Sequence, residues 1–393
     1  MSPRSKLEYL GAIYWRYRRA NRRTKSMILD EFCQNCGFHR KHAIRLIRRF
    51  RPFYKPTPVK RGRKPKYDYQ AILLPLKRVW LAANQPCGKR LKALLPLWLP
   101  GYGSAYSPLP QETNLQLLQL SPASIDRILK HTRQIQGHRG RVTTKPGTLL
   151  KRHIPVKLDQ WNESKPGFLE ADTVAHCGNS GLGTFVFTID TVDIATGWTE
   201  QRAVWGKGET GVLAQIQDIE RSLPFTLLGF DSDNGSEFLN YHLLKYLHHR
   251  SNPVQFTRSR AYHKDDNAHI EQKNWTHVRE WLGYYRFDHQ DFVPLLNDLY
   301  TSEWRLFHNF FCPSAKLIEK SSIFSQKSRK RYDSPKTPLQ RILLSPDVSN
   351  TIKDKLRIQA ANLNPFLLRR VIENKLQRIF TLHSKINASG PLR

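Results

Sequence analysis

The sequence predicts a mixed α/β protein in which helical segments precede and follow a domain built on a β-sheet. Up to about residue 135 the apolar residues have helical spacing, and from Gly167 onward they take the alternation typical of strands. Charge divides the chain in the same way. Residues 1–150 carry 31 Lys and Arg against 6 Asp and Glu, residues 151–300 carry 15 against 20, and residues 301–393 carry 18 against 6. This distribution predicts that the two basic flanks bind a polyanion and that the acidic middle segment binds a cation, such as a divalent metal.

Length and composition limit the class of protein. The 393 residues include 39% hydrophobic residues and nine Trp, which predicts a folded chain of two to four domains rather than a disordered one. Neither a spanning apolar run nor an N-terminal leader is evident, so we expect a cytoplasmic, nucleoid-associated protein. The odd number of cysteines, five, favours free thiols over a disulfide framework.

Residues 1–55 are predicted to be a helix-turn-helix DNA-binding domain. A helix over residues 25–32 leads to a turn at Gly37, and apolar residues then recur with helical spacing from Ala43 to Phe50. The second helix carries the basic residues expected to enter a major groove, namely Arg40, Lys41, Arg45, Arg48 and Arg49. A solvated basic helix is the alternative interpretation.

Two further segments separate this domain from the strands. Residues 56–68 form a Pro-rich basic linker, in which Arg61 and Arg63 either follow a minor groove or simply tether two domains. Residues 69–140 predict a second small helical domain, either another helix-turn-helix or an interaction bundle, whose last helix begins at Ser121 and Pro122. A linker over residues 141–160 follows.

Residues 161–290 are predicted to form a catalytic core, and residues 291–393 a basic helical C-terminal region. Strands are expected over 168–174, 184–192, 198–204, 225–231 and 254–257, and helices over 212–222, 237–249 and 267–282. The order βββαβαβα is the ribonuclease-H-like layout, a mixed sheet flanked by helices. In the C-terminal region a helix is expected around 356–382.

Three carboxylates fall where this layout would bring them to one edge of the sheet. Asp172 lies on the first strand, Asp233 follows the fourth, and Glu271 stands near the start of the long helix. Hard divalent cations prefer oxygen ligands, and two such ions about 4 Å apart can drive an in-line displacement at a phosphodiester. We therefore predict that these residues are catalytic and hold two Mg²⁺ or Mn²⁺ ions.

The residues around these carboxylates resemble a known family. The runs Asp231–Phe238 and Asp266–Asn274 look like the second and third signatures of the DDE integrase core, which bacterial insertion-sequence transposases share with retroviral integrases. The interval of 38 residues from Asp233 to Glu271 is also similar. The resemblance covers about residues 160–320, and the basic front end is similar to that of the bacterial transposases rather than to the zinc-bearing front domain of retroviral integrases.

The resemblance implies a polynucleotidyl transferase. Such an enzyme cuts DNA at the terminal inverted repeats of its element, then joins the freed 3′-hydroxyl to target DNA, acting as a homo-oligomer. Asp172 and Asp233 would hold metals, with Asp172 bridging both, and Glu271 would complete the second site. Asn267 could position substrate or water, and the candidate phosphate contacts, with a solvated basic face as the alternative, are Lys264, Lys273 and Arg279. A nuclease without strand transfer and a catalytically inactive DNA-binding regulator are the alternative functions.

Other residues of these types invite rival assignments. Glu170 and Asp231 share a strand face with Asp172 and Asp233 and are candidate neighbouring ligands, whereas Asp190 and Asp193 are expected to cap a turn. His176 and Cys177 are expected to be structural. Four residues of zinc-ligand type, Cys33, Cys36, His39 and His42, lie within ten residues of one another. This spacing is too compact for an ordinary zinc site, so we expect them to have core or turn roles.

Overall fold

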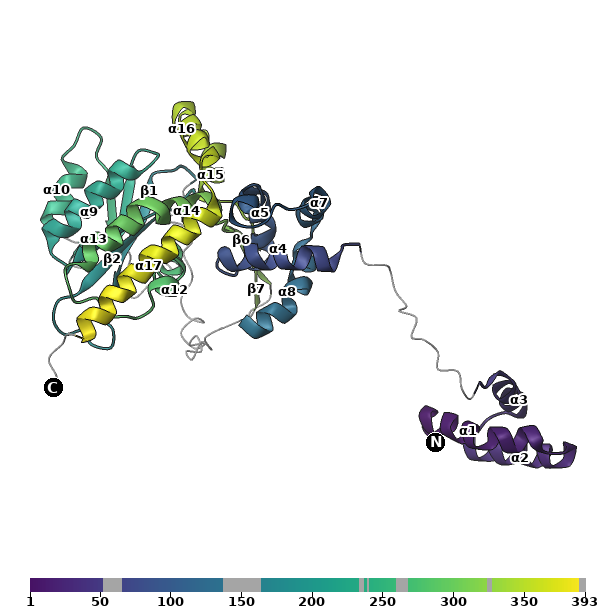
Figure 1. The fold of residues 1–393 in the computed structure, drawn as a ribbon. Helices are drawn as coiled ribbons and strands as arrows, with labels where there is room; N and C mark the ends of the chain where they lie inside the picture. Colours follow the sequence, from purple (N-terminus) through teal and green to yellow (C-terminus); the bar gives the residue numbers. More distant parts are fainter. Residues whose placement is uncertain are drawn as a thin grey trace. The chain divides into compact units, whose positions relative to one another are not determined.

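The computed structural model describes residues 1–51, 66–136, 164–232, 237–238, 240–258, 268–323 and 327–388. The chain divides into two compact units, Met1–Lys66 and Tyr67–Arg393 (Figure 1). Arg61, Arg63, Asp233, Lys264 and Asn267 fall outside the described residues. No helix in the described part is both long enough and apolar enough to cross a membrane.

The first unit consists of helices packed on a small apolar core. They are α1 (Pro3–Arg19), α2 (Arg22–Cys36) and α3 (Arg40–Arg49). Gly37 ends α2 with φ of 63°, a left-handed conformation that glycine adopts without the Cβ penalty. Both predicted helices and the turn between them are present, and their role in reading DNA stays a prediction. Helix α1, capped by the Ser2 side chain, was absent from the prediction.

In the second unit, the helices before the sheet share a core with those after it. They are α4 (Tyr69–Ala82), α5 (Gly88–Trp98), η1 (Leu99–Gly101), α6 (Tyr102–Ala105), α7 (Gln111–Gln119) and α8 (Pro122–Gln136). Ser121 accepts a hydrogen bond from the Ser124 amide at 3.1 Å, as expected for the start of α8. Trp98 of α5 meets Phe307 and Phe366 edge to face. The expected domain boundaries remain predictions; these helices pack on one another and share one core with the C-terminal helices.

Among the described residues, five strands form a mixed sheet in the order β3-β2-β1-β4-β5. The strands are β1 (Phe168–Ala175), β2 (Val186–Asp193), β3 (Thr199–Trp205), β4 (Gly229–Ser232) and β5 (Gln255–Arg258). The pairs β1–β2 and β2–β3 are antiparallel, whereas β1–β4 and β4–β5 are parallel. The chain order of strands and helices matches the predicted order of a mixed sheet flanked by helices.

The two faces of the sheet have different coverings. On one face Leu169 and Ala171 of β1 belong to a core shared with α9 (Glu209–Ser222) and α10 (Tyr241–His248). On the other, Val174 packs into the large core of the second unit. Helix α11 (Ala268–Lys273) crosses β1 and β2 and continues as the π-helical segment η3 (Asn274–Arg279) and α12 (Glu280–Leu282). Because side chains alternate along a strand, Glu170 and Asp172 share the face of Val174.

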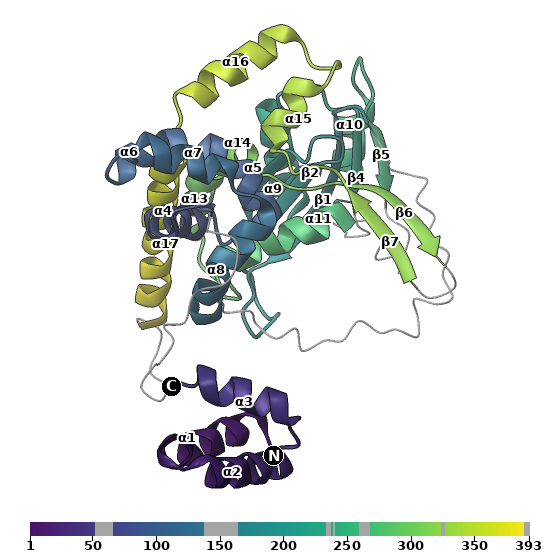
Figure 2. The ribbon, with the colours of Figure 1, turned by 90° about the vertical axis from the view of Figure 1, so that its right-hand side faces the viewer.

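The C-terminal region contains strands that the sequence prediction lacked. It comprises α13 (Phe292–Leu299), η4 (Tyr300–Trp304), α14 (Arg305–Phe311), β6 (Leu317–Ile323), β7 (Lys327–Tyr332), α15 (Pro338–Leu344), α16 (Asn350–Ala361) and α17 (Pro365–Ala388). Strands β6 and β7 pair with each other in a separate two-stranded sheet, visible at the right of Figure 2. At its base, Lys316 Nζ donates to the Ile194 and Ala195 carbonyls at 2.5 and 2.8 Å.

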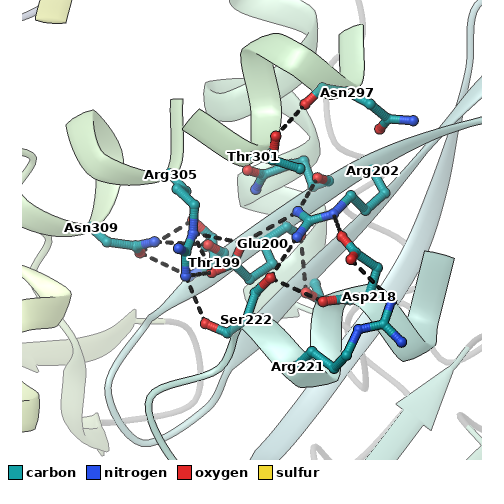
Figure 3. Close-up of polar contacts among 12 residues, drawn as sticks. Thr199, Glu200, Arg202, Asp218, Arg221, Ser222, Asn297, Thr301, Arg305 and Asn309 are labelled. Carbon is teal, nitrogen blue, oxygen red and sulfur yellow. Dashed lines mark hydrogen bonds and ion pairs between the residues drawn. The ribbon is translucent and has the colours of Figure 1, made fainter. Parts of the chain in front are cut away.

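Strand β3, at one end of the sheet order, is paired by side chains instead of another strand (Figure 3). The Asn309 amide accepts from the Thr199 N–H at 2.9 Å and donates to the Thr199 carbonyl at 2.8 Å. Asn297 does the same at Ala203, with distances of 2.7 and 3.0 Å. Two asparagines from α13 and α14 thus satisfy the strand edge as a neighbouring backbone would, which closes it to further pairing.

Candidate active site

Asp172 lies near the middle of β1, the central strand of the sheet, and is half-buried. Its Oδ2 accepts a hydrogen bond from Asn274 Nδ2 at 2.6 Å, and its Oδ1 accepts from the Thr173 amide at 2.7 Å. Asn274 is the first residue of η3. The predicted catalytic carboxylate is therefore tied directly to the helical segment that follows Glu271.

Glu271 is on α11, three residues before Asn274, and its side chain is exposed. A second contact holds this helix on the sheet, because Glu170 Oε2 accepts the Ile270 amide at 3.1 Å. Glu170 is 1% exposed, and an amide near a helix N-terminus is a favourable donor to a carboxylate. Glu170, a rival ligand in the sequence interpretation, thus contacts the backbone next to Glu271.

Asp190 is not in a turn, and that part of the sequence interpretation is wrong. It lies within β2 directly opposite Asp172, is fully buried, and accepts from Gln201 Nε2 at 2.7 Å. Its other oxygen has no hydrogen-bond partner in the described structure. Burial raises the pKa of Asp190 to about 7, and the charge of Asp172 acts in the same direction. Two carboxyl groups therefore face each other across β1 and β2.

Asp193 does cap a turn, as expected. Its carboxylate accepts from the amides of Gly167 and Thr196, both at 2.7 Å. His176, also expected to be structural, is buried and hydrogen-bonded to Thr188 at 2.8 Å.

Asp231 lies on β4 in parallel register with Glu170, and its Oδ1 accepts from Thr257 Oγ1 at 2.7 Å. Strand β4 ends at Ser232, the residue before Asp233. Since Asp233 is outside the described residues, its place relative to Asp172 and Glu271 stays a prediction. Beyond this gap, Glu237 is buried, accepts from Thr173 Oγ1 at 2.9 Å and forms an ion pair with Lys207.

Two of the predicted site residues carry oxygen ligands of the kind that Mg²⁺ and Mn²⁺ prefer. Asp172 offers a carboxylate and the exposed Glu271 offers another. Within the described ranges, however, no cluster of three or more His, Cys, Asp or Glu residues is arranged to hold a metal ion. The donor types of Asp172 and Glu271 fit a hard divalent cation.

The candidate DNA contacts differ in their surroundings. Lys41, Arg45, Arg48 and Arg49 are exposed on α3, whereas Arg40 donates to Ser26 Oγ at 2.6 Å and pairs with Asp30. Lys273 Nζ lies 3.4 Å from Nε2 of the buried His277, and burial lowers the pKa of Lys273 to about 8. Its ammonium group thus faces the interior, a position unsuited to a surface phosphate contact.

The compact cysteine and histidine set lies in the first unit. Cys36 is buried in the core, and the His39 side chain caps α3 by accepting from the Lys41 amide at 3.3 Å. Phe38 and His42 meet edge to face. All five cysteines of the chain lie in the described part, and each is a free thiol there.

Two residues of the site escaped the sequence interpretation. Asn274 belongs to the run that carries the family resemblance, but its contact with Asp172 joins positions 102 residues apart. Gln201, the partner of Asp190, comes from the neighbouring strand. The π-helical geometry of η3 is a third such feature, and π-helical turns occur frequently at functional sites.

Comparisons with known proteins give one curated relative with high coverage. The uncharacterized protein y4rM of Sinorhizobium fredii is 38% identical over 344 residues, which make up 87% of this chain and 96% of that protein. No protein-family model matches the chain. Among solved structures, the catalytic core domain of BIV integrase aligns with a TM-score of 0.27 and 16% identity, covering 44% of this chain and 91% of that one.

Proposed function

The chain belongs to the same family as y4rM of Sinorhizobium fredii, and we propose that it is a DDE-type DNA transposase or integrase. In this proposal it binds the ends of its mobile element, cleaves a DNA strand there and joins the 3′-hydroxyl to target DNA. The observation that carries the proposal is the 2.6 Å hydrogen bond from Asn274 to Asp172. It links a carboxylate on the central strand to the helical segment that presents Glu271.

Each residue of the candidate site has a proposed role. Asp172, Asp233 and Glu271 are the proposed ligands of two Mg²⁺ or Mn²⁺ ions. Asp233 is included because it directly follows β4, the strand that pairs with β1. When bound, such ions activate the attacking oxygen and stabilise the leaving oxygen of a phosphodiester. Asn274 orients the Asp172 carboxylate, and Glu170 holds the start of α11 on the sheet.

DNA binding is proposed for the basic flanks. In the first unit, α3 carries the exposed cations Lys41, Arg45, Arg48 and Arg49, a suitable surface for a phosphate backbone or a major groove. The whole chain has a net charge of +32, which favours association with a polyanion. We propose that it acts at the nucleoid on the inverted repeats of its own element, with several copies on the DNA.

Strand transfer with a Glu271→Gln variant tests this function. The substrate is a pre-cut duplex of the repeats that border the gene, mixed with plasmid and Mg²⁺. Wild type is expected to join the two DNAs, whereas Glu271→Gln should bind the duplex but give no joined product. Glu112→Gln, the same substitution on the exposed start of α7, serves as the matched control and should join like wild type.

Other outcomes point to the alternative functions. Cleavage by wild type without joining would identify a ribonuclease-H-like nuclease. Binding with neither cleavage nor joining would identify a DNA-binding regulator. Joining by Glu271→Gln at the wild-type rate would remove Glu271 from the proposed site.

A further inference from the structure

Trp275 is an exposed tryptophan beside the candidate active site. Its side chain is 53% exposed, although Trp is on average a highly buried residue. It stands four residues after Glu271, about one helical turn along, where Glu271 is exposed as well. Among the described residues, the Trp275 side chain has no hydrogen bond, ring–ring contact or cation–π contact, although part of it is covered by its neighbours. A large flat face therefore lies open to solvent near Glu271.

The backbone that carries Trp275 is held firmly. On one side, the neighbouring Asn274 donates to Asp172 at 2.6 Å. On the other, Thr276 Oγ1 lies 2.8 Å from Nδ1 of the buried His277 and donates to the Gln272 carbonyl at 3.0 Å. The exposed ring thus projects from a π-helical turn whose adjacent residues are fixed to the sheet and to the core.

Further along the same helical segment are a cation and a second exposed aromatic ring. Arg279, one further turn along, lies over the ring of Tyr284 at 4.8 Å and donates to the Ala175 carbonyl at 2.7 Å. Tyr284 is 65% exposed. Exposed aromatic rings interleaved with a cation are typical of surfaces that bind unpaired nucleotides, because every base has a π-face and each phosphate is negative.

We propose that Trp275 is a stacking platform for an unpaired base of the DNA end. The proposal rests on the proposed function and adds to it a binding subsite for single-stranded DNA next to Glu271. Stacking of a base on Trp275 would separate the terminal nucleotides and set the position of the strand relative to Asp172. It requires no hydrogen bond to a base edge, so the subsite would accept all four bases.

Fluorescence of an unpaired 2-aminopurine tests the proposal without requiring catalysis. The probe is a bordering-repeat duplex with a short unpaired overhang that carries 2-aminopurine at each overhang position in turn. Wild type is expected to quench one position strongly by stacking, and Trp275→Phe should retain most of this quenching. Trp275→Ala should lose the quenching and bind the overhang duplex about 5- to 150-fold more weakly.

Two controls separate stacking from a structural effect. An abasic nucleotide at the quenched position should make wild type and Trp275→Ala bind equally. Tyr69→Ala, which removes a half-exposed ring from α4, should change neither affinity nor quenching. Equal quenching by wild type and Trp275→Ala would overturn the proposal. So would an equal loss of affinity for the abasic probe, since no base is then present to stack.

The same preparations distinguish this inference from the proposed function. If wild type quenches the probe through Trp275 but never joins DNA in Mg²⁺, the subsite stands and the transferase function fails. If wild type joins DNA while Trp275→Ala binds, quenches and joins like wild type, the function stands and the subsite is wrong.

Discussion

At the scale of single residues, the contact between Asn274 and Asp172 is the most informative feature of the site. An amide that donates to a carboxylate fixes the orientation of its oxygens. Asp172 also faces the buried Asp190, so its surroundings already contain a second acidic group. The Asn274 donor therefore offsets part of the repulsion that this arrangement creates.

Replacing Asn274 by Ala should slow strand transfer about 10- to 100-fold, the usual effect of losing a partner that orients a metal ligand. Asn274→Asp, of the same shape, should be slower still because it places a carboxylate against Asp172. DNA affinity and the thermal midpoint of Asn274→Ala should stay near wild type. Joining rates are measured at saturating DNA, with the exposed Asn252→Ala as the control. A wild-type rate for Asn274→Asp would show that this contact does not support catalysis.

At the scale of elements, β3 depends on a buried charge network (Figure 3). Glu200 is fully buried and accepts from Arg305 of α14 at 2.7 Å and from Arg202, which is 1% exposed, at 3.3 Å. Arg202 also donates to Asp218 of α9 at 2.6 Å. Strand β3 is thus linked to α14 through Glu200 and to α9 through Arg202.

Glu200→Ala should lower the free energy of unfolding by about 3 to 5 kcal/mol, because it removes one of the two carboxylate partners of the buried Arg202 and the Glu200 partner of the partly buried Arg305. Arg357→Ala breaks an exposed ion pair with Asp354 on α16 and should cost less than about 1 kcal/mol. Urea unfolding of both variants gives the comparison. Similar midpoints would mean that the Glu200 network contributes no more than a surface pair.

The elements also show which features a sequence can predict. Strands β1 to β3 were placed within about two residues because apolar alternation bounded by Gly-containing turns is a local signal. The hairpin β6–β7 was missed because its strands are rich in Lys, Arg and Ser and lack that alternation. The predicted strand 184–192 contains Asp190, but the turn-capping role expected of this residue is wrong, because its side chain is buried in the sheet and bonds Gln201 of the neighbouring strand.

The candidate site shows the same division between features with a local sequence signal and features that depend on tertiary contacts. Candidate ligands were recognisable from residue type and order, since Asp172 and Glu271 lie on the strand and helix that the pattern predicted. Their partners were not recognisable, because the bonds of Asn274 to Asp172 and of Ile270 to Glu170 span about a hundred residues. The inward position of Lys273 depends in the same way on tertiary packing, so the sequence alone left only a phosphate contact and a solvated basic face as interpretations of this residue.

At the scale of the whole molecule, titratable groups occur in two different environments. The basic flanks suit a polyanionic partner, whereas several titratable side chains of the second unit are buried away from water. His277 and His308 stack with ring centroids 4.0 Å apart, and both ring nitrogens of His308 lack a hydrogen-bond partner in the described structure. Burial lowers the pKa of both histidines well below its usual value, and the charge of the nearby Lys273 acts in the same direction.

These histidines make folding sensitive to acid. Below their ordinary pKa of about 6.5, the unfolded chain binds protons that the folded chain excludes, so stability falls as pH decreases. For one such group the loss approaches about 1.4 kcal/mol per pH unit. His308→Phe keeps an aromatic ring against His277 but removes one titrating group.

Buried carboxyl groups such as Asp190 change stability in the opposite sense, but they do so equally in wild type and His308→Phe and cancel in the difference. Between about pH 7.5 and about pH 5.5, the free energy of unfolding of wild type should therefore fall by about 1 kcal/mol more than that of His308→Phe. Urea titrations at the two pH values measure this difference, and parallel changes in the two proteins would mean that His308 takes up its proton in the folded state.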